Sequence, residues 1–193
     1  MILGDFTRVP AVLLVIAWSV FVWRRGLGWW TWAIGIAATA HLSAVASVTL
    51  FPLPVEPEVI AEGRRFQTAS NNLVPFKSLA NALATGGYPS VIDQSVGNFL
   101  MLLPLGIYGP VLWQWMGSWK FALAVGLSAS CGIELLQLAI SGVLGYTYKI
   151  ADIDDVIPNT AGLMAGYVVV RILGRWMGLD SRVRSVDVQH LRA

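Results

Sequence analysis

The stretch FALAVGLSASCGIELLQLAI, residues 121–140, decides the class of this protein. Lys120 precedes it, and Glu134 is the one charged residue among its 20 positions. At about 1.5 Å per residue, a helix of this length crosses most of the roughly 30 Å hydrocarbon core of a lipid bilayer. We therefore predict that this stretch forms a membrane-spanning helix.

Four further apolar stretches flank it along the chain. They cover residues 9–23, 29–53, 96–116 and 156–173, and charged residues, Gly or Pro bound each of them. Of the 193 residues, 56% are hydrophobic and 12% are charged, whereas soluble domains carry about 25% charged residues. The predicted fold is an all-α polytopic membrane helix bundle with about five transmembrane helices.

The composition excludes some partners and points to others. The net charge of +2 is too small for a protein that must neutralise many phosphates, so we expect no nucleic acid. The single cysteine, Cys131, cannot form an intrachain disulfide. Nine Trp residues are typical of a protein that is anchored at membrane interfaces, with lipids as its immediate partners.

The positive charges predict an N-terminus outside and a C-terminus in the cytoplasm, because Lys and Arg resist translocation. In this orientation eight basic residues lie in inner segments and five in outer ones: Arg24, Arg25, Lys120, Arg171, Arg175, Arg182, Arg184 and Arg192 inside, and Arg8, Arg64, Arg65, Lys77 and Lys149 outside. Residues 1–29 then form the first span and a cytoplasmic turn, residues 30–172 form the membrane domain, and residues 173–193 form a basic cytoplasmic tail.

The longest loop, residues 54–95, lies outside in this orientation. Its residues 77–84 have apolar side chains at helical spacing and end at Gly86 and Gly87, which predicts a short helix on the outer surface.

Glu134 is the polar residue that membrane physics explains least. A charged group at the centre of a span costs about 2.5 to 3.5 kcal/mol on insertion scales, so it needs a partner or a purpose. Gln137, three residues later, shares its helix face. Two readings stay open, a functional cavity or a hydrogen bond that fixes helix packing.

A second polar group, Lys149 to Asn159, stands directly before the last span. Asp154 or Asp155 is well placed to cap that helix, but capping needs one carboxylate and the segment also holds Asp152. The spacing matches no calcium loop. Beyond Asn159, the small residues 162–166 predict a close helix contact, within one chain or between copies in a homo-oligomer.

These residues carry a resemblance to the VanZ-like family of bacterial membrane proteins, which covers roughly residues 30–172. The matching motifs are TLFP (49–52), NLVPF (72–76), GNFLMLLPLG (97–106), ELLQ (134–137) and DIDDVIPNTAG (152–162). The departure is Lys149, where the family pattern usually shows Arg. A lysine keeps the charge but lacks the planar fork that recognises carboxylates or phosphates in a bidentate way.

The resemblance implies a multi-pass protein of the bacterial cell membrane, with lowered susceptibility to lipoglycopeptides such as teicoplanin as the activity of the founding member. We expect an amphiphile or a lipid-linked cell-wall precursor to bind at the outer membrane interface, with no cofactor and no resident metal. The candidate ligand-binding residues are Asn72, Pro75, Phe76, Asn98, Glu134, Gln137, Lys149, Asp152, Asp154, Asp155 and Asn159.

Three alternatives stay open. The first is a membrane scaffold without a ligand. The second is an enzyme that acts on a lipid-linked substrate, which we favour less because the chain shows no recognised nucleophile motif. The third is a proton-coupled carrier that uses Glu134 and His41.

Overall fold

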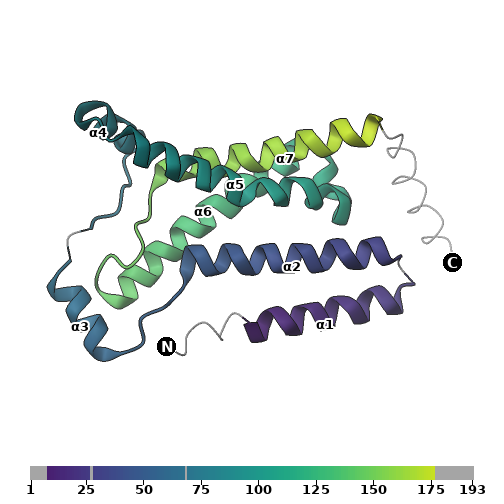
Figure 1. The fold of residues 1–193 in the computed structure, drawn as a ribbon, viewed down its shortest axis with the longest axis horizontal. Helices are drawn as coiled ribbons and strands as arrows, with labels where there is room; N and C mark the ends of the chain where they lie inside the picture. Colours follow the sequence, from purple (N-terminus) through teal and green to yellow (C-terminus); the bar gives the residue numbers. More distant parts are fainter. Residues whose placement is uncertain (1–7, 27, 68, 177–193) are drawn as a thin grey trace.

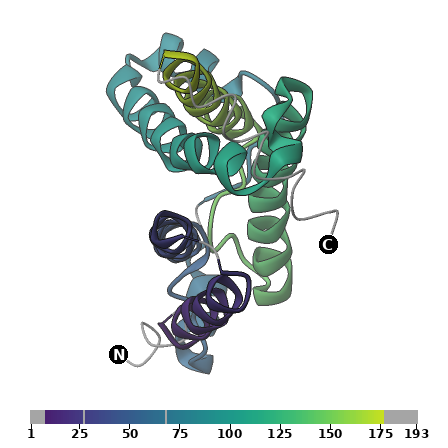
Figure 2. The same ribbon diagram turned by 90° about the vertical axis from the view of Figure 1, so that its right-hand side faces the viewer.

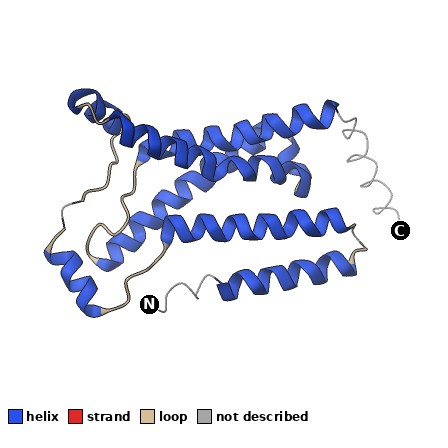
Figure 3. Ribbon diagram, in the orientation of Figure 1, coloured by secondary structure: helices blue, strands red, loops and turns tan. Residues whose placement is uncertain are grey.

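The computed structural model describes residues 8–26, 28–67 and 69–176 (Figure 1). These residues are mostly helical and contain no β-strand (Figure 3). The α-helices are α1 (Arg8–Arg24), α2 (Trp29–Leu50), α3 (Pro57–Arg65), α4 (Lys77–Thr85), α5 (Tyr88–Leu112), α6 (Trp119–Leu144) and α7 (Val156–Trp176). Two 3-10 helices, η1 (Gln114–Gly117) and η2 (Ile153–Asp155), precede α6 and α7.

The five predicted membrane stretches correspond to α1, α2, α5, α6 and α7. By length and composition, α2, α5, α6 and η2 with α7 can each cross a membrane, while α1 is a shorter apolar helix. The prediction of an all-α polytopic bundle is therefore confirmed. The side of the membrane on which each terminus lies stays a prediction. The tail predicted at residues 173–193 falls, from residue 177 on, outside the described residues.

The long loop holds more helix than predicted. The short helix predicted at residues 77–84 is present as α4, and Gly86 ends it in the left-handed conformation, at φ 75°. The helix α3 was not predicted. It forms because Pro57 occupies its first turn, Glu58 complements its N-terminus, and basic residues occupy its last turn.

The helix α5 begins at Tyr88, eight residues ahead of the predicted stretch 96–116. Pro89 suits its first turn, where the missing N–H group costs no hydrogen bond. Polar residues follow Pro89, so residues 88–95 were not predicted as part of the apolar stretch, although they belong to the same helix.

The contact between α5 and α7 is built from backbone against glycine. A Cβ atom added to Gly162 would lie 1.9 Å from the carbonyl oxygen of Phe99, and one added to Gly166 would lie 2.1 Å from that of Leu103. On α5, a Cβ atom at Gly106 would lie 1.9 Å from the carbonyl oxygen of Leu163. The small residues predicted at 162–166 thus bring two parallel helices together within one chain.

The core lies where α5, α6 and α7 meet. Leu163 on α7 and Ala122 on α6 are fully buried, and Leu102 on α5 is 2% exposed. Gly126 of α6 lies against Thr160 of α7, so this contact also depends on a small residue. These three helices position the loops at their ends.

The pair α1 and α2 lies beside α5 and α7 (Figure 2), and Ala38 of α2 packs into the same core as Leu102 and Leu163. His41 joins α2 to α5, because its Nδ1 lies 3.0 Å from the Tyr108 hydroxyl and its Nε2 lies 2.8 Å from the Met101 carbonyl oxygen. A carbonyl oxygen only accepts, so Nε2 carries the proton and the tyrosine donates to Nδ1. His41 therefore pairs with α5, not with Glu134.

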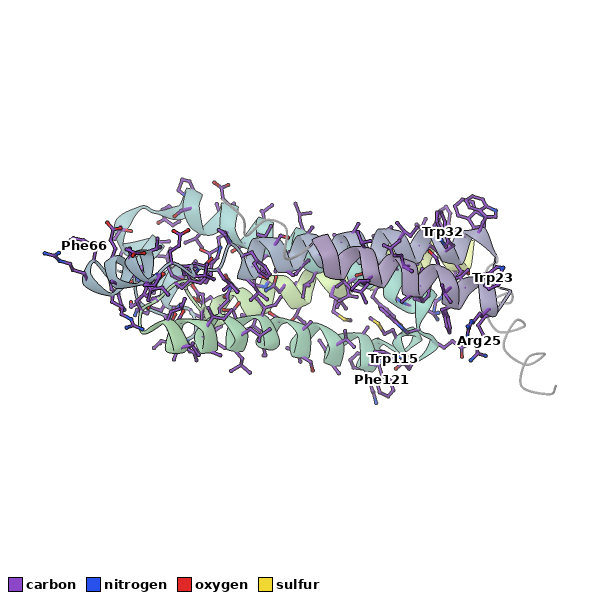
Figure 4. All side chains as sticks on the ribbon, turned by 90° about the horizontal axis from the view of Figure 1, so that it is seen from below. Trp23, Arg25, Trp32, Phe66, Trp115 and Phe121 are labelled. Carbon is purple, nitrogen blue, oxygen red and sulfur yellow. The ribbon has the colours of Figure 1, made fainter. Side chains whose placement is uncertain are left out.

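The Trp side chains gather at one end of the bundle, which we call the Trp end. They come from α1, α2, the α5–α6 connection, the first residue of α6 and the last residue of α7: Trp18, Trp23, Trp29, Trp30, Trp32, Trp113, Trp115, Trp119 and Trp176. Figure 4 shows Trp23, Trp32 and Trp115 at this end and Phe66 at the opposite one, which we call the α4 end. Such a cluster is typical of a membrane–water boundary.

Candidate functional site

The site forms at the α4 end, where two loops that are 80 residues apart in sequence pair with each other. Asn72 and Asp152 form an isolated parallel β-bridge. The Asn72 N–H donates to the Ala151 carbonyl oxygen at 2.9 Å, and the Ile153 N–H donates to the Asn72 carbonyl oxygen at 2.9 Å. This bridge fixes the loop before α4 against the loop before α7.

The side chains of the bridge residues hold the same contact. Asn72 Nδ2 donates to Asp152 Oδ1 at 2.7 Å, and both residues are buried. The Ser78 hydroxyl donates to Asp152 Oδ2 at 2.8 Å, which ties α4 to the same carboxylate. Buried polar groups are stable only when paired, and each of these has a partner.

Asp154 caps α4 rather than α7. Its carboxylate accepts the backbone N–H groups of Phe76 and Ser78, the latter at 3.0 Å. The expectation that Asp154 or Asp155 caps the last span is therefore wrong for Asp154, because the loop pairing brings the N-terminus of α4 within its reach. The cap also holds Phe76 in the left-handed conformation, at φ 63°, which a bulky residue rarely adopts.

Pro75 explains the shape of this turn. The Lys77 N–H donates to the Val74 carbonyl oxygen at 3.2 Å, so Pro75 and Phe76 are the two central residues of a β-turn. Proline suits the first of these positions. A positive φ at the second position usually requires glycine, so the Phe76 side chain is retained there at a steric cost.

Asp155 faces α5. Gln94 Nε2 donates to both of its carboxylate oxygens, at 2.9 and 3.0 Å. Asn98 lies one turn further along the same side of α5, and its buried Nδ2 is a second, weaker donor near Asp155. Asp155 is half-buried, and both of these amide donors are neutral.

Glu134 connects α6 to the loop before α7. Its Oε2 accepts the backbone N–H of Asp152 at 2.7 Å. The glutamate thus fixes the segment that carries the aspartates. It does not line the pocket described below.

Three predicted site residues lie elsewhere. Gln137 donates to the Thr49 carbonyl oxygen at 3.0 Å, and Lys149 Nζ lies 3.4 Å from the Val48 carbonyl oxygen, so both reach the end of α2. Asn159 Nδ2 donates to Ser130 Oγ at 3.1 Å inside the α6–α7 contact. Lys149 is therefore turned toward α2, away from the aspartates.

A pocket of about 210 Å³ opens between α4, the first turns of α5, and η2 with the start of α7. Four predicted residues line it: Phe76, Asp152, Asp154 and Asp155. The other lining residues were not predicted from the sequence: Ser78, Leu79, Val91, Gln94, Ser95, Ile157 and Pro158. Gln94 and Ser95 could have been predicted as site residues, because they are polar and stand directly before an apolar stretch.

The carboxylates at this end have neutral partners. Amide, hydroxyl and backbone N–H groups are the donors that reach Glu134, Asp152, Asp154 and Asp155. No group of three or more His, Cys, Asp or Glu side chains in the part of the chain that the structure describes is placed to hold a metal ion. The site thus combines negative charge with apolar walls.

One known protein family matches most of this chain. The model of the VanZ/LLP1 family matches residues 38–174, which run from the middle of α2 to the last turn of α7. The chain belongs to the VanZ/LLP1 family. No curated protein and no solved structure matches it. The protein is therefore a multi-pass membrane protein of the VanZ type, and the matched region contains every residue of the site and of the pocket.

Proposed function

We propose that this VanZ-type protein resides in the bacterial cell membrane and binds an amphiphilic or lipid-linked envelope ligand in the pocket between α4, α5 and α7. In this proposal, binding lowers susceptibility to lipoglycopeptides such as teicoplanin. The observation that carries the proposal is the pocket itself, in which Leu79, Val91 and Ile157 stand beside three aspartates at one end of a membrane bundle. An amphiphile presents the same two kinds of surface.

The size of the pocket limits what enters it. A volume of about 210 Å³ is below the range of roughly 300 to 1,000 Å³ that holds whole drug-sized ligands. We therefore propose that the pocket holds one end of a larger molecule, with the rest in the lipid or in the water outside it.

Asp155 is the proposed contact for the polar group of the ligand. A carboxylate offers about four acceptor positions, and the amides of Gln94 and Asn98 do not fill all of them at Asp155. The nearby Lys149 is turned toward α2. A donor group of the ligand, such as an amine, suits this end of the pocket better than a phosphate does.

A pocket-filling variant tests the proposal. Ile157→Trp adds bulk at a lining position that is 57% exposed, so the fold tolerates it. A susceptible host that expresses the wild type should survive a higher concentration of teicoplanin than the empty host, and Ile157→Trp should abolish that gain. Membrane levels of each protein are checked by blotting.

The matched control is Val169→Trp. Val169 is also an exposed apolar residue of α7, at 44% exposure, but it lies more than three turns away from the pocket. It should keep the protection. Equal protection by both variants, or none by the wild type at equal membrane level, contradicts the proposal.

A scaffold without a ligand is the second candidate, and the hydrogen bonds of the aspartates favour it. Asp152 and Asp154 each join separate segments, so their charges have a structural use. This candidate predicts that Ile157→Trp leaves every phenotype unchanged, because the variant breaks none of these bonds.

A further inference from the structure

The helix α4 presents three different faces. Ser78 and Ala82, four residues apart, face the protein, where Ala82 is 3% exposed and the Ser78 hydroxyl bonds Asp152. Leu79 and Leu83, also four residues apart, form an apolar stripe that is 48% and 62% exposed. A helix with such faces fits a boundary between water and an apolar phase.

The third face of α4 is polar. Lys77 and Asn81 form it, at the same spacing, and both are exposed. Angles of 100° per residue place Asn81 about 160° from Leu83 around the helix axis. The two faces therefore point in nearly opposite directions.

The loop before α4 extends the apolar stripe. Leu73, Val74 and Phe76 are 62%, 59% and 60% exposed, and they lie within the turn that Asp154 holds at the start of α4. Five large apolar side chains are thus exposed on α4 and on the loop directly before it. Soluble surfaces rarely expose large apolar patches.

The position of α4 along the bundle matches the headgroup layer. The helix α5 has 25 residues, and about 20 residues cover the hydrocarbon core of a bilayer. With the Trp end of α5 at one boundary, about five residues, or about 7 Å, project beyond the opposite boundary. The headgroup layer on each side is about 5 to 8 Å thick, and α4 joins α5 through Gly86 and Gly87 at that level.

Figure 1 shows α4 beyond the first turns of α5, at the same end of the molecule as α3, and turned across the direction of α5. A helix that lies across a membrane-spanning helix at this level runs along the membrane plane. Its apolar stripe can then face the acyl chains while Lys77 and Asn81 face water and headgroups.

We propose that α4 and the turn before it form an in-plane membrane anchor, with Leu79, Leu83 and Phe76 inserted between the lipids of the leaflet that surrounds the first turns of α5. Phe76 and Leu79 also line the pocket, so the anchor places one wall of the pocket against the lipid. A ligand that resides in the bilayer can then enter sideways. This last consequence rests on the proposed function, whereas the anchor itself does not.

Fluorescent labels at two positions of α4 test the anchor. In a Cys131→Ser background, Leu83→Cys and Asn81→Cys are each labelled with an environment-sensitive dye, and the full chain is placed in lipid nanodiscs. The Leu83 label should emit at shorter wavelength and be quenched by lipids that carry a doxyl group near the headgroup. Iodide in water should quench the Asn81 label with a quenching constant about threefold larger than that of the Leu83 label.

The outcomes separate the anchor from its alternatives. Equal quenching of both labels by iodide overturns the proposal, because α4 then lies in water. A Leu83 label that neither iodide nor doxyl lipids reach also overturns it, because a protein then covers the stripe. The measurement needs no ligand, so its result stands whether or not the pocket binds one.

Discussion

The contact between α5 and α7 and the contact between α1 and α2 are both helix pairs, but their construction differs. In α5–α7, three glycines place the backbone of one helix against carbonyl oxygens of the other. In α1–α2, the Trp18 ring fills the space over Gly35, and Ser19 accepts a hydrogen bond from Trp32 at 2.9 Å. The first contact admits no added atom, whereas the second is made of side chains that can adjust.

The tight contact belongs to α5 and α7, which hold the site, whereas the adjustable contact belongs to α1 and α2, which do not line the pocket. Gln94 lies in the second turn of α5 and Asp155 directly precedes α7, so the separation of these two helices sets the width of the pocket. The family match starts at residue 38, within α2, and leaves α1 outside. The match thus covers most of α2, all of α3, α4, α5 and α6, and α7 up to its last turn.

Gly162→Ala should have the largest effect of the substitutions considered. The new methyl group would lie 1.9 Å from the Phe99 carbonyl oxygen, which forces α5 and α7 apart. We expect a loss of about 2 to 4 kcal/mol of stability, measured as thermal unfolding in detergent. Gly132→Ala on α6 is the control, because it meets no atom within 4 Å. Similar unfolding temperatures for the two variants would show that the tight contact is absent.

Asn72→Ala should have the next largest effect. Asn72 donates to Asp152 and Ser78 and accepts the Val74 N–H, so its loss leaves a buried carboxylate short of a donor. The expected loss is about 2 kcal/mol, together with faster proteolysis of the loop before α4. The exposed Asn81→Ala variant on α4 should match the wild type in both measurements. Unchanged proteolysis of Asn72→Ala contradicts the loop pairing.

The sequence predicted the helices well because hydropathy and length determine membrane spans. It also located the glycines of α7, although a single sequence does not show whether such a face meets its own chain or another copy. It could not predict the pairing of Asn72 with Asp152, because 80 residues separate them and neither residue type indicates which residue it pairs with.

The same limit explains the errors within the site. The prediction placed Asp154 or Asp155 as the cap of the helix that follows, which has the nearest N-terminus in sequence. The bridge at Asn72 brings the N-terminus of α4 closer in space. Lys149 was grouped with the aspartates for the same reason, whereas its side chain reaches Val48 of α2.

Two substitutions of Glu134 distinguish the effect of its hydrogen bond from the effect of its negative charge. A Glu134→Gln variant keeps an oxygen that can accept the Asp152 N–H, so its stability should stay within about 0.5 kcal/mol of the wild type. Glu134→Ala removes the acceptor and should cost about 1 to 2 kcal/mol. Thermal unfolding of the two variants side by side measures the difference. If Gln costs as much as Ala, the negative charge of Glu134 matters rather than its hydrogen bond.

Tyr108→Phe should have the smallest effect. It removes the hydroxyl that donates to His41, one of the links from α2 to α5. Interhelical hydrogen bonds in membranes contribute about 0.6 kcal/mol on average, so unfolding should shift by little more than the error. A loss comparable to that of Gly162→Ala would mean that α2 belongs to the rigid core.

A binding measurement decides whether the pocket between α4, α5 and α7 takes an amphiphile. The wild type, Ile157→Trp and Val169→Trp are placed in nanodiscs, and binding of teicoplanin and of a lipid-linked cell-wall precursor is measured separately with vancomycin as a comparison compound. We expect saturable binding of at least one of the two amphiphiles to the wild type and to Val169→Trp, and none to Ile157→Trp. Equal binding to all three proteins, or binding of neither amphiphile to a folded wild type, contradicts it.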